Sequence, residues 1–486
     1  MQPAKTEFEV VIVGSGFAGL CTAVKLREAG IDDFVILEKD REAGGTWWAN
    51  QYPGCAVDVP SHLYCFSFGP HPGWTRAFAR QEELLAYTRS IVRHFDLARH
   101  IRVATAFEGA DLIEDSGSWR IRTSTGLLTA RCIVSATGSL NRAAIPALPG
   151  LDRFQGKVFH SSAWDHGYAL DGKRVAVIGT GASAIQFVPE IVGRVAQLDL
   201  YQRTAPWILP RPDRAIGRGE RWLLARVPGL RRLYRALVYV QHEARALPYV
   251  HAPGLLRAAQ WLALRHLRRQ VSDPALRRKL TPDYTLGCKR VLLMNSYYPA
   301  LTRPNLALLT APIARVTETG IVGADGQERA VDAIIFGTGF EVAHALHAAQ
   351  VRGRGGKLLF ADGLEAYKGC AVAGFPNYFL VTGPNTGLGH NSMIYMIESG
   401  VRYVVDAIKT IRARGLHSVE VKAQVQHDYN AALQRRMRGT VWSTGCRSWY
   451  LDASGRNRTL WPGFTFTYRR LTRRFDIDNY LVNAGA

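Results

Sequence analysis

The chain has 486 residues, of which 47% are hydrophobic and 21% charged, proportions typical of a globular protein with two or three domains. No apolar stretch is long enough to span a bilayer, and the N-terminus mixes both charge signs, so we expect neither a membrane span nor a signal peptide. The seven cysteines are odd in number and scattered, without a C-x-x-C motif. They predict free thiols in a reducing cytosol, and they count against a disulfide framework, a metal site or a dithiol reductase.

The formal net charge of +21 is unusually high and raises the question of nucleic-acid binding. The arginines are, however, spread along the chain without a repeated aromatic–basic motif. We therefore expect no nucleic-acid partner. We interpret the charge as an arginine-rich composition whose field attracts anionic cofactors.

The first predicted element is a buried strand at 10–13, followed by a glycine-rich turn and a helix at 20–29. In such a turn the first glycine makes the bend, the second lets the backbone approach a pyrophosphate, and the third lets helix and strand pack closely. A second strand at 34–37 ends at Glu38, which is placed to accept hydrogen bonds from a ribose diol. We therefore predict an FAD site here. Its motif residues are Gly14, Ser15, Gly16, Phe17, Ala18, Gly19 and, beside Glu38, Lys39.

The same pattern recurs 165 residues later, with strands predicted at 174–178 and 197–201 and a helix between them. The position that corresponds to Glu38 is now Arg203. A carboxylate would repel a 2′-phosphate whereas an arginine can clamp one, so this site should prefer NADP to NAD. Its further motif residues are Gly179, Thr180, Gly181, Ala182, Ser183, Ala184 and Thr204.

Two apolar strands, at 131–139 and 332–340, both end in a small residue followed by Thr-Gly, and the second contributes Thr338 and Gly339. Each is expected where the chain passes between two nucleotide domains. The predicted fold is therefore α/β, with two Rossmann-like dinucleotide-binding domains and the NADP domain inserted in the FAD domain. The predicted divisions are 1–149 (FAD domain, first part), 150–335 (NADP domain, with a helical insertion at about 215–285) and 336–486 (FAD domain, return, and a C-terminal active-site loop).

The helical insertion carries two apolar stripes with arginines on the other faces. Basic helices of this kind commonly form a subdomain with solvated charges, which is the interpretation we prefer. The alternative is contact with an anionic membrane surface through residues 230–270. The stripes are Leu230, Leu233, Tyr234, Leu237 and Val238, and Leu255, Ala258, Ala259 and Leu262.

Two longer motifs identify a family. The stretch FQGKVFHSSAWD, residues 154–165, matches the pattern F-x-G-x-x-x-H-x-x-x-W-[P/D] at every fixed position. The stretch GGTWWANQYPGCAVD, residues 44–58, matches [A/G]-G-x-W-x4-[F/Y]-P-[G/M]-x3-D. With the two nucleotide motifs, the chain resembles the type I Baeyer–Villiger monooxygenases, a group of class B flavoprotein monooxygenases, over nearly its whole length.

The resemblance implies a catalytic arginine at Arg290, with Asp58 as its partner and also as a cofactor-binding residue. It further implies that Lys289 adds to 2′-phosphate binding and that Trp449 closes over the nicotinamide nucleotide. Without the resemblance, Asp58 and Arg290 could equally be a buried structural ion pair. The other residues that it implies near the flavin are Gly45, Thr46, Trp47, Val59, Tyr64 and Asn385.

The implied activity is FAD- and NADPH-dependent insertion of one oxygen atom of O2 next to a ketone carbonyl, through a C4a-peroxide of the flavin, giving an ester or lactone. Alternatives are a flavin monooxygenase that oxidises nitrogen or sulfur, and an uncoupled NADPH-oxidising flavoprotein. In the 154–165 stretch we prefer His160 as a hinge residue to His160 as a general base, and Trp164 as packing. The sequence after Trp449 departs from that of many cyclic-ketone enzymes, so the substrate stays open, as does the oligomeric state.

Overall fold

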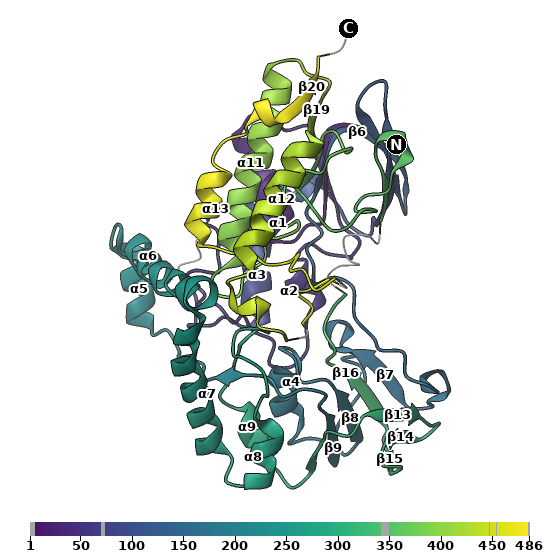
Figure 1. Cartoon of the computed structure of the whole chain (residues 1–486), viewed down its shortest axis with the longest axis vertical. Coiled ribbons are helices and arrows are strands. Elements are labelled where there is room, and N and C mark those ends of the chain that lie inside the picture. Colours follow the sequence, from purple (N-terminus) through teal and green to yellow (C-terminus); the bar gives the residue numbers. More distant parts are fainter. Residues whose placement is uncertain (1–4, 70–72, 342–348, 447, 453, 485–486) are drawn as a thin grey trace.

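The computed structural model describes residues 5–69, 73–341, 349–446, 448–452 and 454–484. In this part of the chain two main sheets lie at opposite ends of an elongated molecule, and a group of helices flanks them on one side (Figure 1). No helix of the described residues is long and apolar enough to cross a membrane.

The larger sheet has the strand order β17-β4-β5-β6-β1-β2-β3, with β18 also paired to β6. Strand β1 lies between β2 and β6 and runs parallel to both. Its last four residues are buried, because α1 and α11 pack on one face of the sheet, and β4, β5 and the segment from Leu359 to Phe375 pack on the other. The strands are β1 (Glu7–Val13), β2 (Phe34–Leu37), β3 (Ile101–Arg102), β4 (Phe107–Ile113), β5 (Ser118–Thr123), β6 (Gly126–Ser135), β17 (Gln350–Arg352) and β18 (Tyr378–Leu380).

The smaller main sheet is wholly parallel, in the order β12-β9-β8-β16-β7. The strands predicted at 174–178 and 197–201 are confirmed at these bounds. The stretch at 154–165 contributes an edge strand to this sheet, which a connector alone would not do. The strands are β7 (Lys157–His160), β8 (Arg174–Ile178), β9 (Gln197–Tyr201), β12 (Leu306–Leu309) and β16 (Ala333–Phe336).

The remaining strands form small separate sheets. They are β10 (Ile208–Leu209) with β11 (Leu292–Leu293), β13 (Ile313–Val316) with β14 (Gly320–Gly323) and β15 (Glu328–Ala330), and β19 (Ser418–Val421) with β20 (Tyr480–Asn483).

The predicted fold class is confirmed: every strand of the larger sheet lies before residue 136 or after 349, and every strand of the smaller main sheet lies between 157 and 336. The domain boundaries themselves stay a prediction. Around the larger sheet, α1 packs on the long helix α11. The helices near the two sheets are α1 (Phe17–Glu28), α2 (Thr46–Ala49), α3 (Gln81–His94), α4 (Ala184–Ile191), α9 (Tyr297–Leu301), α11 (Met393–Ala413), α12 (Ala423–Met437) and α13 (Thr465–Leu471).

The segment predicted to be helical at about 215–285 contains four α-helices, of which α5 and α6 stand out from the body of the molecule (Figure 1). They are α5 (Arg218–Arg226), α6 (Leu230–Glu243), α7 (Leu256–Gln270) and α8 (Pro274–Leu280).

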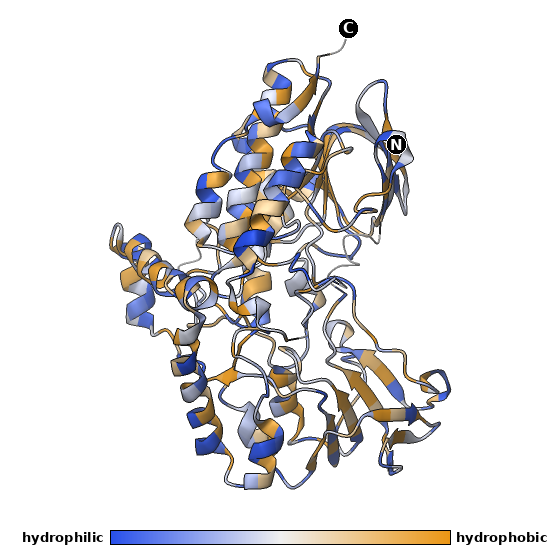
Figure 2. Cartoon of the chain, viewed as in Figure 1, coloured by the Kyte–Doolittle hydropathy of each residue, from blue (hydrophilic) through white to orange (hydrophobic). Residues whose placement is uncertain are grey.

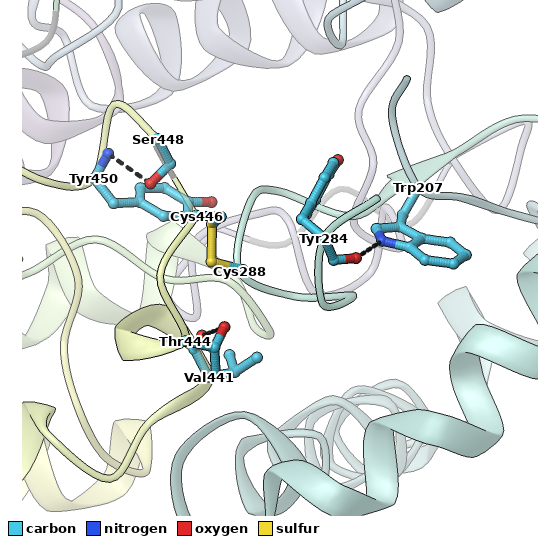
Figure 3. The surroundings of a disulfide bond; sticks show 8 residues. All are labelled: Trp207, Tyr284, Cys288, Val441, Thr444, Cys446, Ser448 and Tyr450. Carbon is cyan, nitrogen blue, oxygen red and sulfur yellow. Dashed lines mark hydrogen bonds between the residues drawn. A yellow bond between two sulfur atoms is a disulfide. The ribbon is translucent and has the colours of Figure 1, made fainter. Parts of the chain in front are cut away.

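The cysteines differ from the prediction of free thiols. Cys288 and Cys446 form a disulfide that joins the segment before Lys289 to the loop that carries Ser448 and Tyr450 (Figure 3). The partners are 158 residues apart, so spacing in the sequence gives no sign of the pairing. The cysteine pattern therefore gives no support to a reducing compartment. The remaining cysteines are buried free thiols, as predicted: Cys21, Cys55, Cys65, Cys132 and Cys370.

Reduction of this disulfide should destabilise the protein, because the crosslink restricts the unfolded chain. We expect a reductant, or the substitution Cys446→Ser, to lower the free energy of unfolding by about 2–4 kcal/mol. Denaturant titration with and without reductant measures the change. The reductant should have no further effect on Cys446→Ser, and a wild type with the same stability in both conditions would contradict the crosslink.

Candidate active site

The turn after β1 has the geometry of a nucleotide-binding turn. Gly14 has φ of +100°, and a Cβ there would lie 2.8 Å from the carbonyl oxygen of Ala136, at the end of β6. A Cβ on Gly19 would collide with the carbonyl oxygen of Gly14. Both positions therefore require glycine, and the backbone of the turn stays open to a ligand at the N-terminus of α1.

Glu38 is held against this turn from the end of β2. Its side chain is buried, and its Oε2 atom accepts hydrogen bonds from the backbone nitrogen (3.0 Å) and hydroxyl (2.5 Å) of Ser15. The backbone nitrogen of Asp40 donates to Oε1 at 3.0 Å. The carboxylate retains lone pairs for a diol. Lys39, by contrast, forms an ion pair with Asp40 at the surface, at 3.0 Å.

The second family motif packs against the first. A Cβ on Gly45 would lie 2.8 Å from Cα of Gly16, so the two backbones touch where a side chain would separate them. The ring of Trp47 meets that of Tyr64 edge-on at 5.7 Å, and Phe17 lies 5.4 Å from the same tyrosine. The indole nitrogen of Trp47 is buried without an acceptor among the described residues. A glycine cradle, an aromatic cluster and an orphaned donor fit a flavin nucleotide.

The sequence predicts three further residues near the flavin. Thr46 and Val59 belong to the same N-terminal segment as Trp47, whereas Asn385 belongs to the C-terminal part of the chain. Thr46 begins α2, and Val59 is partly buried against the main core. Asn385, at φ of +56°, donates from Nδ2 to the carbonyl oxygens of Asn457 and Leu460, each at 2.9 Å. Its Oδ1 atom is buried without a donor among the described residues. Asn385 thus ties the return segment together and keeps one acceptor for a ligand.

The turn after β8 repeats the first turn. Gly179 has φ of +104°, and its Cβ would lie 2.6 Å from the carbonyl oxygen of Gly337, at the end of β16. The hydroxyl of Thr180 donates to the carbonyl oxygen of Thr204 at 3.1 Å. Thr338 donates in turn to the carbonyl oxygen of Ala144 at 2.5 Å. The Thr-Gly end of each predicted crossing strand therefore lies beside a nucleotide turn.

The remaining motif residues line the same turn and the start of α4. Ala184 is fully buried at the third motif position, where its Cβ would lie 3.1 Å from a Cβ on Gly337. The other motif residues are Gly181, Ala182 and Ser183, together with Gly339, which has φ of +82°.

Arg203 and Lys289 come together at the end of β9, although they are far apart in the sequence. Burial and the neighbouring charge of Arg203 lower the pKa of Lys289. The Lys289 ammonium also lies 4.5 Å above the ring of Tyr284. Two cations held near each other favour an anion between them, so this corner fits the 2′-phosphate of NADPH.

Asp58 and Arg290 form the predicted pair, from loops 232 residues apart in the chain. Nε of Arg290 donates to Oδ2 of Asp58 at 3.0 Å, and Nη2 donates to the same oxygen. The side chains of Asp58 and Arg290 are 32% and 41% exposed, so the pair is half-buried. The pair can therefore present charge to a ligand.

The two charges hold each other ionised. Burial alone would raise the pKa of Asp58, but the charge and hydrogen bond of Arg290 outweigh it and keep that pKa below its ordinary value. The carboxylate in turn raises the pKa of Arg290 above its ordinary value. At neutral pH the site therefore keeps a permanent guanidinium.

Trp449 and its neighbour Tyr450 occupy the C-terminal loop, with rings 4.4 Å apart. Trp449 is 46% exposed, whereas Tyr450 is buried beside Arg290. Burial raises the pKa of the Tyr450 hydroxyl, and the charge of Arg290 opposes that rise. Tyr450 thus interacts with the charge of Arg290, and the sequence analysis passed over it because the family pattern draws attention to the tryptophan.

Gln186 on α4 is a second residue that the sequence analysis missed. Its Oε1 accepts from the hydroxyl of Tyr52 at 2.9 Å, and its Nε2 donates to the carbonyl oxygen of Ala56 at 3.0 Å. Helix α4, which follows β8 of the smaller sheet, is therefore hydrogen-bonded to the loop that ends at Asp58. Arg211, also missed, donates to the carbonyl oxygen of Val57 at 2.8 Å. A single glutamine or arginine in a long sequence gives no signal of such a role.

The stretch at 154–165 lies at the edge of the smaller sheet, and the hinge role of His160 stays a prediction. His160 accepts from the backbone nitrogen of Ser162 at 3.1 Å, and burial lowers its pKa, so the ring is neutral at pH 7. Trp164 packs against Phe159 and Phe187, at 5.2 and 5.3 Å between rings, as expected of a packing residue. Among the described residues no cluster of His, Cys, Asp or Glu could hold a metal ion.

Comparisons with known proteins agree with this geometry. The family model described as flavin-binding monooxygenase-like matches residues 7–354. A Baeyer–Villiger monooxygenase of Pseudomonas aeruginosa is 53% identical over 97% of this chain and 91% of its own length. A Baeyer–Villiger monooxygenase of Streptomyces coelicolor is 47% identical over 97% of this chain and 92% of its own length.

A solved structure leads to the same family. An oxidised steroid monooxygenase bound to NADP superposes with a TM-score of 0.87 at 31% identity, and the match covers 99% of this chain and all of the other. The two nucleotide turns, the Asp58–Arg290 pair and these similarities over almost the full length have one common explanation. The chain belongs to the flavin-binding monooxygenase-like family and, within it, to the Baeyer–Villiger monooxygenases.

Proposed function

We propose that this protein uses FAD and NADPH to insert one oxygen atom of O2 next to a ketone carbonyl, giving an ester or lactone, with the second oxygen atom leaving as water. The observation that carries the proposal is the accessible pair of Asp58 and Arg290. Oxidation of nitrogen or sulfur needs no stabilised anion, whereas addition of activated oxygen to a carbonyl develops negative charge on oxygen.

Each cofactor has its own set of residues in this proposal. The turn after β1, with Glu38, Trp47 and Asn385, would hold FAD. The turn after β8, with Arg203 and Lys289, would hold NADPH. The chemistry that these cofactors supply when bound is hydride transfer and the activation of O2. The protein contributes position, charge and exclusion of water.

Arg290 would stabilise the negative charge that develops on the ketone oxygen as its carbonyl carbon becomes tetrahedral. A guanidinium suits this role because it stays protonated and presents several donors in one plane. Asp58 would orient the guanidinium group of Arg290 by accepting a hydrogen bond from Nε. Further N–H donors of Arg290 would then remain for a ligand. Trp449 and Tyr450 would cover the site from the C-terminal loop, which keeps water from the developing charge.

The domain division at 149/150 and 335/336 remains part of the proposal, supported by the change of sheet between β6 and β7 and between β16 and β17, although 335/336 itself falls within β16. A cytosolic location is proposed on the requirement for NADPH, which the cytosol supplies. The identity and size of the ketone stay open, because the loop after Trp449 differs from the pattern of many cyclic-ketone enzymes.

The direct test offers the holoenzyme a panel of cyclic, linear and aryl methyl ketones, with thioanisole and a tertiary amine, under ¹⁸O2. Ester or lactone carrying one heavy oxygen atom is the expected product. Sulfoxide or N-oxide alone would favour the nitrogen- and sulfur-oxidising class. One hydrogen peroxide released per NADPH, whatever compound is offered, would indicate an uncoupled flavoprotein.

Arg290→Ala should keep bound FAD and reduction of the flavin by NADPH but lose ester formation. Removing one preorganised donor to an oxyanion typically lowers kcat by about 100- to 1000-fold. Anaerobic flavin bleaching and product yield measure the two steps separately. Arg194→Ala, which removes only a surface ion pair with Asp171, is the matched control. Normal ketone oxygenation by Arg290→Ala would show that the assigned role is wrong.

Arg203→Ala should mainly raise the KM for NADPH. Losing a charge-assisted hydrogen bond to the 2′-phosphate costs about 1.5–3 kcal/mol, which corresponds to roughly a 10- to 100-fold weaker preference for NADPH over NADH. Flavin reduction by each nucleotide measures the ratio, and NADH serves as the internal control because it lacks the phosphate. An unchanged preference for NADPH over NADH would show that Arg203 does not bind the 2′-phosphate.

A further inference from the structure

The helices α5 and α6 and the segment after them expose an unusual number of large apolar side chains. In α5 the side chain of Trp222 is 62% exposed. In α6 Leu237 and Val240 are 61% and 62% exposed. We call this the α5–α6 surface. Its members are Trp222, Leu223, Val227, Leu233, Leu237, Val240 and Leu247.

The exposed side chains on α6 form one stripe. Leu233, Leu237 and Val240 follow the spacing i, i+4, i+7, which places them on one side of a helix. The opposite side is anchored, because Arg235 donates to the carbonyl oxygen of His62 at 2.9 Å and Tyr239 stacks on Tyr395 at 5.0 Å. The helix therefore cannot turn its apolar stripe inward without losing these contacts.

The charges around the stripe have one sign. Between residues 218 and 270 the sequence has eleven arginines against two glutamates, Glu220 and Glu243. Glu220 pairs with Arg214, and Glu243 is buried, where it accepts from Asn391 and Thr465. Both carboxylates are therefore already occupied within the protein, so the partner that complements this surface is an anion.

A shallow hollow on α5 combines an exposed apolar side chain with positive charge. It is lined by Gly73, Arg218, Arg221, Trp222 and Ala225. Among the described residues neither Arg218 nor Arg221 has a carboxylate partner. Two unpaired guanidinium groups beside an exposed indole suit a phosphate with an apolar region next to it.

We propose that the α5–α6 surface docks the enzyme on an anionic phospholipid bilayer. The leucines and valines would enter the boundary between headgroups and acyl chains, Trp222 would lie at the headgroup level, and the arginines would contact phosphates. In Figure 1 these helices project from one edge of the molecule, so a flat surface can reach them before the sheets. Figure 2 shows hydrophobic and hydrophilic residues alternating along α6, as expected of a helix that lies in an interface.

A second copy of the chain fits the surface less well. A two-fold dimer brings the same patch of both subunits together. Here that contact would place the arginines around each stripe opposite one another and raise like-charge repulsion. An anionic bilayer satisfies both the apolar stripe and the charge.

The test is flotation of the FAD-loaded enzyme with vesicles of phosphatidylcholine alone and of phosphatidylcholine with 30% phosphatidylglycerol. We expect binding to the anionic vesicles, weakened by salt, and little binding to the neutral ones. The double variant Leu233→Ser/Leu237→Ser and the single variant Trp222→Ser should each bind at least about 10-fold more weakly. Leu481→Ser, which changes an equally exposed leucine on β20, is the matched control and should bind as the wild type does.

Retained flavin absorbance and an unchanged melting temperature show that the variants are folded, which is expected because the altered side chains are at the surface. No preference for the anionic vesicles, or equal binding by both α5–α6 variants and wild type, would overturn the proposal. So would a wild type that sediments as a dimer without lipid while the same variants sediment as monomers, since a second copy would then cover the surface.

Discussion

The pairing of Asp58 with Arg290 depends on nearly every other part of the structure. Asp58 lies in the loop after α2, in the N-terminal part of the chain, and Arg290 follows the helices of the insertion, so the two meet only when segments 232 residues apart have come together. Each residue keeps the other ionised. A site of this kind cannot assemble locally, because its two charged residues come from distant parts of the chain.

The two nucleotide turns share one backbone arrangement. Each has a first glycine at positive φ that lies against the end of the neighbouring parallel strand, at Ala136 in one case and at Gly337 in the other. What separates the two turns is the residue at the end of the next strand, Glu38 or Arg203. The protein thus distinguishes its two proposed nucleotides by the sign of one charge, while the backbone that receives the pyrophosphate stays the same.

Much of this was predictable from the sequence, because the signals are local. The strands at 174–178 and 197–201 have the predicted bounds, and Glu38 and Arg203 stand at the expected strand ends. The failures are non-local. No spacing predicts that Cys288 meets Cys446, or that Tyr450 lies buried beside Arg290. Periodicity predicted an apolar stripe on α6 that includes Leu233 and Leu237, which are exposed, but also Val238, which is buried, and it does not say which side of the helix another element covers.

Gln186 has a mechanical consequence. Its amide is bonded to Tyr52 and Ala56, whereas its helix begins at the second nucleotide turn. A displacement of α4 relative to the larger sheet must either break these bonds or pull the 52–58 loop along with it. The connection between α4 and the carboxylate of Asp58 therefore consists of one side chain and two residues of backbone. A shift of α4 would therefore also move the carboxylate that pairs with Arg290, and so change the charge next to that guanidinium.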